Sequence, residues 1–296
     1  MIIEARHAST ERYRLGEGVV WDDRGERLLW VDIDGGALYD APLPDGDNPL
    51  RPRRLYSSDE TVGCVVLGES GELLLAEGDH LVLLDGSGKI HRSGRIIPGD
   101  RPRRLNDGAC DPQGRLLVGT LSTTTPRCGE QLLRVEADGS VATVLDGLTL
   151  ANGIAFSPDG STTFIADTLR STIWVSDQTT LGWKPAFTVD GLPDGMTTDS
   201  QGRLWIAMWG AGEVRCIEPD GFIHAIVHVP APHVTSVAFA GTNLDRLIIT
   251  TATKDLDTRQ IAEFPASGAL FVADVDAVGL PTHRWSQALA FPLIHS

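Results

Sequence analysis

The chain has 296 residues, with 40 Asp or Glu against 25 Lys or Arg, which gives a formal net charge of −15. This acidic balance argues against nucleic acid and anionic membranes as partners, because both repel a negative protein surface. Four cysteines without Cys-x-x-Cys spacing give no sign of a disulfide scaffold, and no apolar run is long enough to span a bilayer. The start of the chain lacks the apolar core of a signal peptide, so we expect a cytoplasmic protein.

A short strand pattern recurs six times along the chain. Its apolar second strand begins at Leu28, Leu73, Leu116, Phe164, Leu204 and Leu247, at intervals of 40 to 48 residues. An inner strand and a polar turn precede this strand in each repeat, and a third apolar strand follows it. No stretch sustains an amphipathic helical period. Strand-rich repeats of this length are typical of propeller blades, so we predict an all-β, six-bladed β-propeller.

The predicted elements follow one order in every repeat. The inner strands are expected at residues 18–21, 63–66, 108–110, 153–156, 195–198 and 236–239, and the third strands at 37–39, 81–84, 132–135, 172–175, 214–217 and 269–272. These repeats occupy residues 1–296 as a single domain. Residues 2–6 remain outside the repeats, and we expect them to pair with the last blade and close the ring.

The position just before each inner strand is polar in most repeats. It holds Glu17, Asn106, Asn152 and Asp194, with Val62 and Thr235 in the other two repeats. Since inner strands line the central channel, the four polar side chains should converge at its mouth. Two of the four are carboxylates, whose mutual repulsion and desolvation a bound divalent cation would relieve. The sequence therefore predicts a central metal site.

The kind of cation follows from the donor atoms. An all-oxygen donor set suits calcium, magnesium, manganese or ferrous iron, and zinc also accepts carboxylates. The alternative for each Asn or Asp is an ordinary turn role before glycine. Glu17 argues against that alternative, because Glu has no special turn role, and so does the shared register of all four residues.

Several motifs in this order resemble the gluconolactonase/regucalcin (senescence marker protein) family, and the bacterial sugar lactonases in particular. They are Gly-Glu-Gly-Val-Val-Trp at 16–21, Arg-Leu-Asn-Asp-Gly at 104–108, Asn-Gly-Ile-Ala-Phe-Ser-Pro-Asp-Gly at 152–160, and Pro-Asp-Gly at 193–195 with Gly-Arg-Leu-Trp at 202–205. Ala-Met-Trp-Gly at 207–210 and Pro-Ala-Pro-His-Val-Thr at 230–235 add to the likeness. The resemblance extends from about residue 17 to about residue 278.

The resemblance implies a propeller that hydrolyses sugar lactones with one divalent cation, in carbohydrate catabolism. It assigns metal binding to Glu17, Asn152 and Asp194, and substrate binding to Arg104 and Asn106. Asp194 is also the candidate for proton transfer. We therefore expect a small sugar lactone as partner, no nucleic acid or membrane, and a monomer or weak homo-oligomer.

The chain departs from the family at one substrate-contacting position. Some members carry an acidic residue after a Gly-Thr-Met segment, where it touches substrate hydroxyls. Here Gly119-Thr120-Leu121 is followed by Ser122-Thr123-Thr124, which has no carboxylate. Recognition of the hydroxyls must therefore differ, and the identity of the sugar stays open.

The chemistry of a lactone fits these residues. Hydrolysis of a cyclic ester needs carbonyl polarisation, a positioned water and a stabilised oxyanion, which a divalent cation and a fixed arginine can supply. No Gly-x-Ser-x-Gly nucleophile motif is present, and His224 and His228 lack the Glu of a zinc protease.

Other interpretations remain open at this point. One is a non-catalytic propeller that binds a cation or a partner protein, and another is an esterase or organophosphate hydrolase on the same scaffold. A polar mouth would favour sugars and an apolar mouth other esters. Arg104 could also be a surface residue of the basic run 101–104, Trp205 and Trp209 could shape the pocket or pack between strands, and a packing role is favoured for His233.

Overall fold

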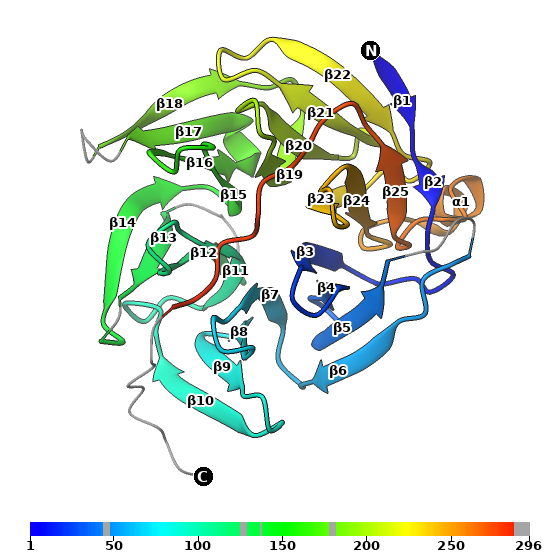
Figure 1. The fold of residues 1–296 in the computed structure, drawn as a ribbon. Coiled ribbons are helices and arrows are strands. Elements are labelled where there is room, and N and C mark those ends of the chain that lie inside the picture. The colour runs from blue at the N-terminus through cyan, green and yellow to red at the C-terminus, as the bar shows by residue number, and fades with distance from the viewer. Residues whose placement is uncertain (44–47, 125–128, 137, 178–181, 287–296) are drawn as a thin grey trace.

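The computed structural model describes residues 1–43, 48–124, 129–136, 138–177 and 182–286. Six sheets surround a central channel like the blades of a propeller (Figure 1). Five are four-stranded, and one gains a fifth strand. Within each blade, neighbouring strands are antiparallel and follow one another in the sequence, apart from the added N-terminal strands. The prediction of an all-β, six-bladed propeller is therefore confirmed.

The strands of each blade are numbered from the channel outward. The inner strands are β3 (Gly16–Asp22), β7 (Val62–Leu67), β11 (Arg103–Cys110), β15 (Ala151–Phe156), β19 (Leu192–Thr198) and β23 (Val234–Ala240). The second strands are β4 (Arg27–Asp32), β8 (Leu73–Glu77), β12 (Leu116–Ser122), β16 (Thr162–Asp167), β20 (Leu204–Trp209) and β24 (Arg246–Thr251).

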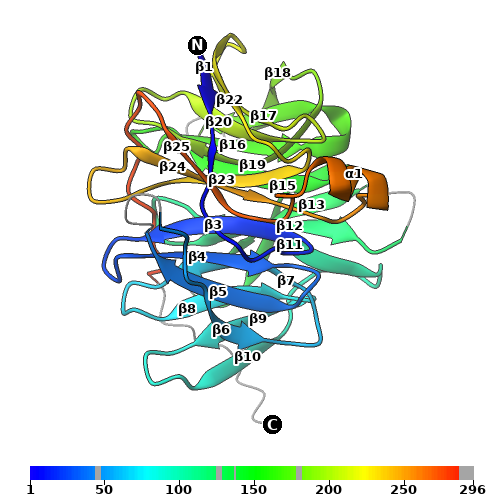
Figure 2. The same cartoon turned by 90° about the vertical axis from the view of Figure 1, so that its right-hand side faces the viewer.

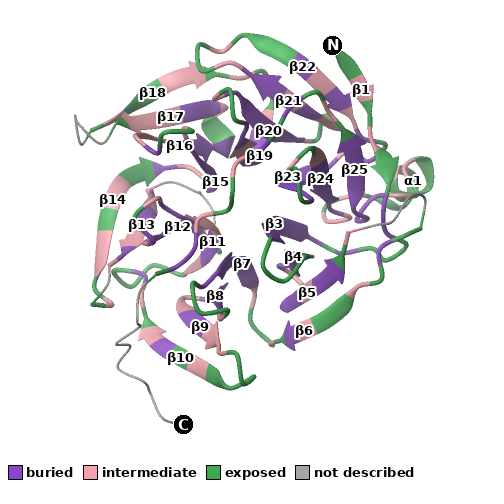
Figure 3. Ribbon diagram, viewed as in Figure 1, coloured by how far each residue is buried: buried purple, intermediate pink, exposed green. Residues whose placement is uncertain are grey.

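The remaining strands lie farther from the axis. The third strands are β5 (Ala37–Pro42), β9 (His80–Leu84), β13 (Glu130–Val135), β17 (Thr172–Asp177), β21 (Glu213–Ile217) and β25 (Phe271–Asp274). The outer strands are β6 (Arg53–Ser57), β10 (Ile90–Arg95), β14 (Val141–Leu148), β18 (Trp183–Thr188) and β22 (Ile223–His228). Burial falls from the inner and second strands to the outer ones, so the core lies between the inner halves of adjacent blades (Figure 3).

The N-terminal segment joins two blades. Strand β2 (Arg6–His7) pairs antiparallel with β25 and completes the last blade, as expected. Strand β1 (Ile2–Glu4) instead pairs in parallel with β22 of the fifth blade. The expectation that residues 2–6 all belong to the last blade was therefore partly wrong, because the chain crosses from one blade edge to the next at Ala5.

Every inner strand is irregular at the residue that faces the channel mouth. The pairing register of each inner strand with its second strand shifts at this point, as it does between Ala151 and Ile154 in β15. Such bulges bend a strand and redirect its side chains. A Cβ atom on Gly153 would lie 2.5 Å from the Asp194 carbonyl oxygen, so glycine lets neighbouring inner strands approach closely at the axis.

One end of the channel is covered by residues 277–286, which we call the C-terminal strap. Beyond β25 the strap crosses the channel opening (Figure 1). Backbone bridges join Gly279 to Asp199 and Trp285 to Gly68, and the Trp285 side chain is fully buried. The repeat pattern did not predict this segment.

A single turn of α-helix, α1 (Thr258–Glu263), lies on the face opposite the strap (Figure 2). Asp257 caps it by accepting a hydrogen bond from the Gln260 backbone, while the Gln260 side chain accepts one from the Asp257 backbone. This capping box is visible in the sequence as Asp-x-x-Gln, and it was missed because six residues are too few for a helical period. Within the described ranges, no helix is long and apolar enough to cross a membrane.

Candidate active site

The channel holds two cavities, one beyond the other along the axis. We call them the mouth cavity, of about 160 Å³, and the axial cavity, of about 140 Å³. Along β15, Asn152 lines the mouth cavity and Ile154 lines the axial cavity. Along β19, Asp194 lines the mouth cavity and Met196 lines the axial cavity. The strap residues 280–283 line the axial cavity, so the mouth cavity lies toward the other face.

The mouth cavity brings together all five residues that were predicted to bind the metal and the substrate. It is lined by Glu17, Arg104, Asn106, Asn152 and Asp194, from four different blades. The two carboxylates and the two amides are all buried. Arg104 is partly exposed at the cavity wall instead of lying on the outer surface. Their proximity is thus observed, whereas their individual roles stay predictions.

A chain of hydrogen bonds crosses the site from blade to blade. Arg104 Nη1 donates to Asn106 Oδ1 at 2.8 Å, and Asn106 Nδ2 donates to Asn152 Oδ1 at 3.4 Å. The Asn152 amide in turn donates to Asp194 Oδ1, and to Thr168 Oγ1 at 3.2 Å. Thr168 belongs to the short 3₁₀ helix η1 (Thr168–Arg170). The chain of bonds links the side chains of neighbouring blades in the ligand-free protein.

The site holds two buried carboxyl groups whose charged forms are disfavoured. Burial raises the pKa of Glu17 well above its usual value, and the charges of Asp194 and Asp107 raise it further. Burial likewise raises the pKa of Asp194, as does Asp107, although hydrogen bonds from Asn152 and Glu17 act in the opposite direction. Arg104 lowers the pKa of Glu17 but does not offset the effect of burial.

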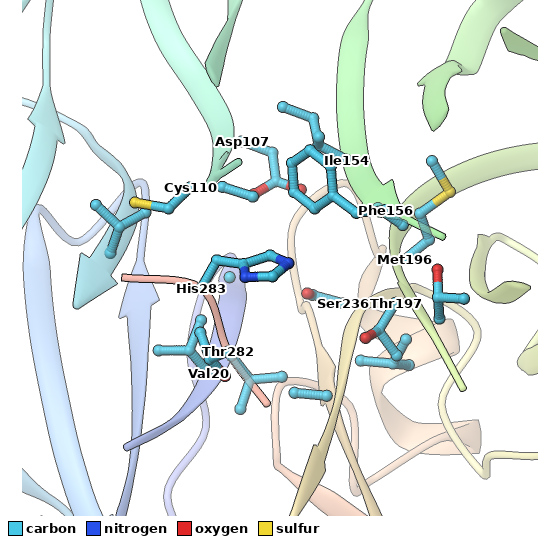
Figure 4. Close-up of a pocket in the computed structure, with 18 of the residues that line it drawn as sticks. Val20, Asp107, Cys110, Ile154, Phe156, Met196, Thr197, Ser236, Thr282 and His283 are labelled. Carbon is cyan, nitrogen blue, oxygen red and sulfur yellow. The ribbon is translucent and has the colours of Figure 1, made fainter. Parts of the chain in front are cut away.

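Asp107 is a third carboxylate in the channel that sequence reasoning missed. It lines the axial cavity together with Ile154, Phe156 and His283, which face the same space in Figure 4. Burial raises the pKa of Asp107 to about 6, although the Gly108 N–H donates to it at 2.8 Å. Its position between Asn106 and Gly108 resembled a turn, and the bulge of β11 at Leu105 and Gly108 places it in the channel instead.

The donor set fits a divalent cation. Glu17, Asn152 and Asp194 offer only oxygen donors once the Asn152 amide turns its oxygen inward, and two of the three are buried carboxylates that repel each other. Among the described residues, no group of three or more His, Cys, Asp or Glu side chains could hold an ion. A cation here would therefore depend on the amide oxygen of Asn152 as well as on the carboxylates.

The rim of the mouth cavity is of mixed polarity. Five leucines line the cavity, namely Leu15, Leu121, Leu150, Leu169 and Leu192, together with Ile33, Trp209, Lys254 and Asp255. Trp205 does not reach the cavity, since it is buried and packs edge-on against Phe239 with ring centroids 5.7 Å apart. The Ser122 hydroxyl donates to the Thr124 carbonyl at 2.8 Å, so the segment after Leu121 turns back on itself.

Comparison with known proteins adds independent findings. The family described as SMP-30/Gluconolactonase/LRE-like region matches residues 15–253. Pentonolactonase XacC of Haloferax volcanii is 35% identical, over 92% of this chain and 94% of its own. L-arabinolactonase of Azospirillum brasilense is 33% identical, over 93% of each chain. The crystal structure of a calcium-binding protein, regucalcin, from Agrobacterium tumefaciens superposes with a TM-score of 0.86, at 25% identity over 96% of this chain and 99% of that one.

Proposed function

The chain belongs to the SMP-30/gluconolactonase family, and from this premise we propose that it is a lactonase that opens sugar lactones with the help of one divalent cation. The observation that carries the proposal is the convergence of Glu17, Asn152 and Asp194 beside Arg104 and Asn106 in one cavity. Relatives named pentonolactonase and L-arabinolactonase support the reaction class.

Glu17, Asn152 and Asp194 would hold the cation. When bound, a divalent cation polarises the lactone carbonyl and stabilises negative charge on its oxygen. Calcium, zinc, manganese, magnesium and ferrous iron are all compatible with this donor set. A structure of a relative described as a calcium-binding protein supports calcium as the first ion to test.

The protein side chains provide orientation and proton transfer. Arg104 holds its guanidinium at the cavity wall through Asn106, where it can bind the lactone carbonyl oxygen and then the carboxylate product. Asp194 would accept a proton from the attacking water as the water oxygen bonds to the carbonyl carbon. The bond between that carbon and the ring oxygen then breaks, and the proton passes to the ring oxygen to give the hydroxy acid.

Two other functions use the same cavity. A propeller that only binds a cation would keep Glu17, Asn152 and Asp194 but would not need Arg104 and Asn106 beside them. An esterase or organophosphate hydrolase is favoured by one observation, the five leucines that line the mouth cavity. These alternatives are therefore outcomes of the test below.

The test measures proton release from a panel of substrates. Glucono-, xylono-, arabinono- and galactonolactone, with an apolar ester and an organophosphate for comparison, are added to chelated protein and to protein reloaded with each cation. We expect cation-dependent acceleration above the no-enzyme rate with at least one sugar lactone. No acceleration with any sugar lactone and any cation would overturn the proposal, and turnover of the apolar ester or the organophosphate alone would favour the esterase or phosphotriesterase.

A further inference from the structure

We propose that Trp209 and Asp255 form a selectivity subsite at the rim of the mouth cavity, which favours lactones that carry several hydroxyl groups. In this subsite Trp209 stacks on the C–H face of the lactone, and Asp255 accepts hydrogen bonds from its hydroxyls. The inference rests on the proposed lactonase function. It concerns residues that lie outside the predicted metal and substrate set.

Trp209 is held as a flat platform. Its indole stacks on the imidazole of His233, with ring centroids 4.0 Å apart and planes inclined by 12°. The two residues also form a backbone bridge, and His233 Nδ1 donates to the Lys254 carbonyl at 2.8 Å. Since His233 covers one face of the indole, a ligand in the mouth cavity meets the other face or the edge. Aromatic rings fixed in this way present large apolar area at little entropic cost.

Asp255 is held at the same rim in an unusual backbone conformation. Its φ of 62° lies in the left-handed region, which Asp adopts more readily than most other non-glycine residues. Within the described part of the chain, no hydrogen bond or ion pair engages its carboxylate, although it lines the cavity. Its carboxylate oxygens are therefore available to a ligand.

The segment around Asp255 is anchored on both sides. Before it, the Lys254 backbone N–H donates to the Arg14 carbonyl at 2.8 Å, and Lys254 Nζ lies 3.0 Å from Asp34 Oδ1. After it, Asp257 starts α1 through the capping box. These contacts keep Asp255 at the rim in its left-handed conformation, and the ion pair with Asp34 draws the Lys254 charge away from it.

Trp209 and Asp255 are chemically complementary to a ring that carries hydroxyl groups. A carboxylate only accepts hydrogen bonds, and its two oxygens can serve two neighbouring hydroxyls. The rim leucines offer no such acceptor, so Asp255 supplies the recognition that Ser122–Thr124 does not. Asp255 is exposed, so water hydrates its carboxylate in the free protein, and discrimination comes from hydrogen bonds that a hydroxylated lactone makes and an unsubstituted lactone does not.

The first experiment compares a polyhydroxylated aldonolactone with unsubstituted δ-valerolactone, using the full-length, cation-loaded protein. Asp255→Asn keeps the size and tolerates the left-handed backbone. We expect it to lower the ratio of kcat/KM for the hydroxylated lactone to kcat/KM for δ-valerolactone by about 3- to 10-fold. Trp209→Leu should raise KM for the hydroxylated lactone by about 3- to 10-fold. Trp209→Phe, which keeps an aromatic ring, should have a KM close to that of wild type. The matched controls are Asp276→Asn, in the segment after β25, and Trp183→Phe, in β18.

A second experiment measures binding without turnover. Titration with the corresponding alditol should change the indole fluorescence of wild type and of Trp183→Phe, but not that of Trp209→Phe. If wild type hydrolyses sugar lactones while Asp255→Asn keeps the wild-type ratio, the subsite is overturned and the lactonase function stands. If wild type hydrolyses no lactone, the proposed function fails, and a fluorescence change that persists in Trp209→Phe would overturn the subsite as well.

Discussion

The two ends of the central channel are built from the same inner strands, yet they contain different chemistry. At the mouth, two buried carboxylates and two amides face each other, and burial raises the pKa of both acids. At the other end, the strap covers the opening, Trp285 anchors it between the second and third blades, and Arg284 Nη2 lies 2.8 Å from Asp22 Oδ1. The buried carboxyl groups at the mouth therefore cost folding stability but offer ligands to a cation, whereas the strap contacts contribute stability.

The largest effect is expected from variants that disrupt the site at the channel mouth. Glu17→Ala or Asp194→Ala should lower kcat on the best sugar lactone by about 1000-fold or more, since a cation ligand is lost. Neither change should unfold the blades, because removing one of the two carboxylates removes the repulsion between them in the cation-free protein. Lactone hydrolysis and far-ultraviolet circular dichroism check the two parts. Wild-type rates in both purified, metal-loaded variants would contradict the site.

The next largest effect is expected from a substitution that removes a strap contact and leaves the mouth cavity unchanged. Trp285→Ala empties a fully buried site between the second and third blades, so we expect a loss of about 3–5 kcal/mol in unfolding free energy. Denaturant unfolding measures this loss. Because Trp285 does not line the mouth cavity, kcat of the folded fraction should stay near wild type. A stable variant with impaired catalysis would show that the two ends are coupled.

A smaller effect concerns acid stability at the strap. Burial alone would raise the pKa of Asp22, but hydrogen bonds from Arg284, Arg27 and Gly25 outweigh it, and the pKa is lowered. The folded state therefore binds fewer protons than the unfolded state, and the stabilisation present above about pH 4 is lost as the pH falls. Arg284→Met should cost about 1–3 kcal/mol at neutral pH and flatten this acid dependence. Equal acid dependence in the two proteins would contradict the assignment.

The smallest effect is expected beside the mouth. Asp257→Ala removes the cap of α1 and should cost about 0.5–1 kcal/mol, because the helix is short and buries no residue. Thermal unfolding measures the stability change. A loss comparable to that of Trp285→Ala would show that α1 supports the ring and does not merely anchor the neighbouring rim.

Most of the fold and the polar centre of the site could be predicted from the sequence. The blades repeat, so strand pattern and turn residues appear six times, and one register relates Glu17 to Asp194 across four blades. The mutual proximity of the site residues followed from that register, and the family resemblance is confirmed by the match over residues 15–253.

The features that the sequence did not predict do not recur from blade to blade. The strap has no periodic pattern, and its contacts to Asp22, Gly68 and Gly114 join segments far apart in the chain. Asp107 and Asp255 depend on local backbone irregularities, a bulge in one case and a left-handed residue in the other. Neither irregularity has a strong signature in the residue types.

The pairing of β2 with β25 also sets the order in which the protein can mature. Arg6 is synthesised well before its partner Val272, because most of the described chain lies between them. Each early blade can form from local hairpins while synthesis continues, whereas Arg6 and His7 must wait until Phe271 and Val272 have been made. Sealing of the ring therefore follows formation of the earlier blades, and until then the outer edge of β25 is open to pairing with a neighbouring nascent chain.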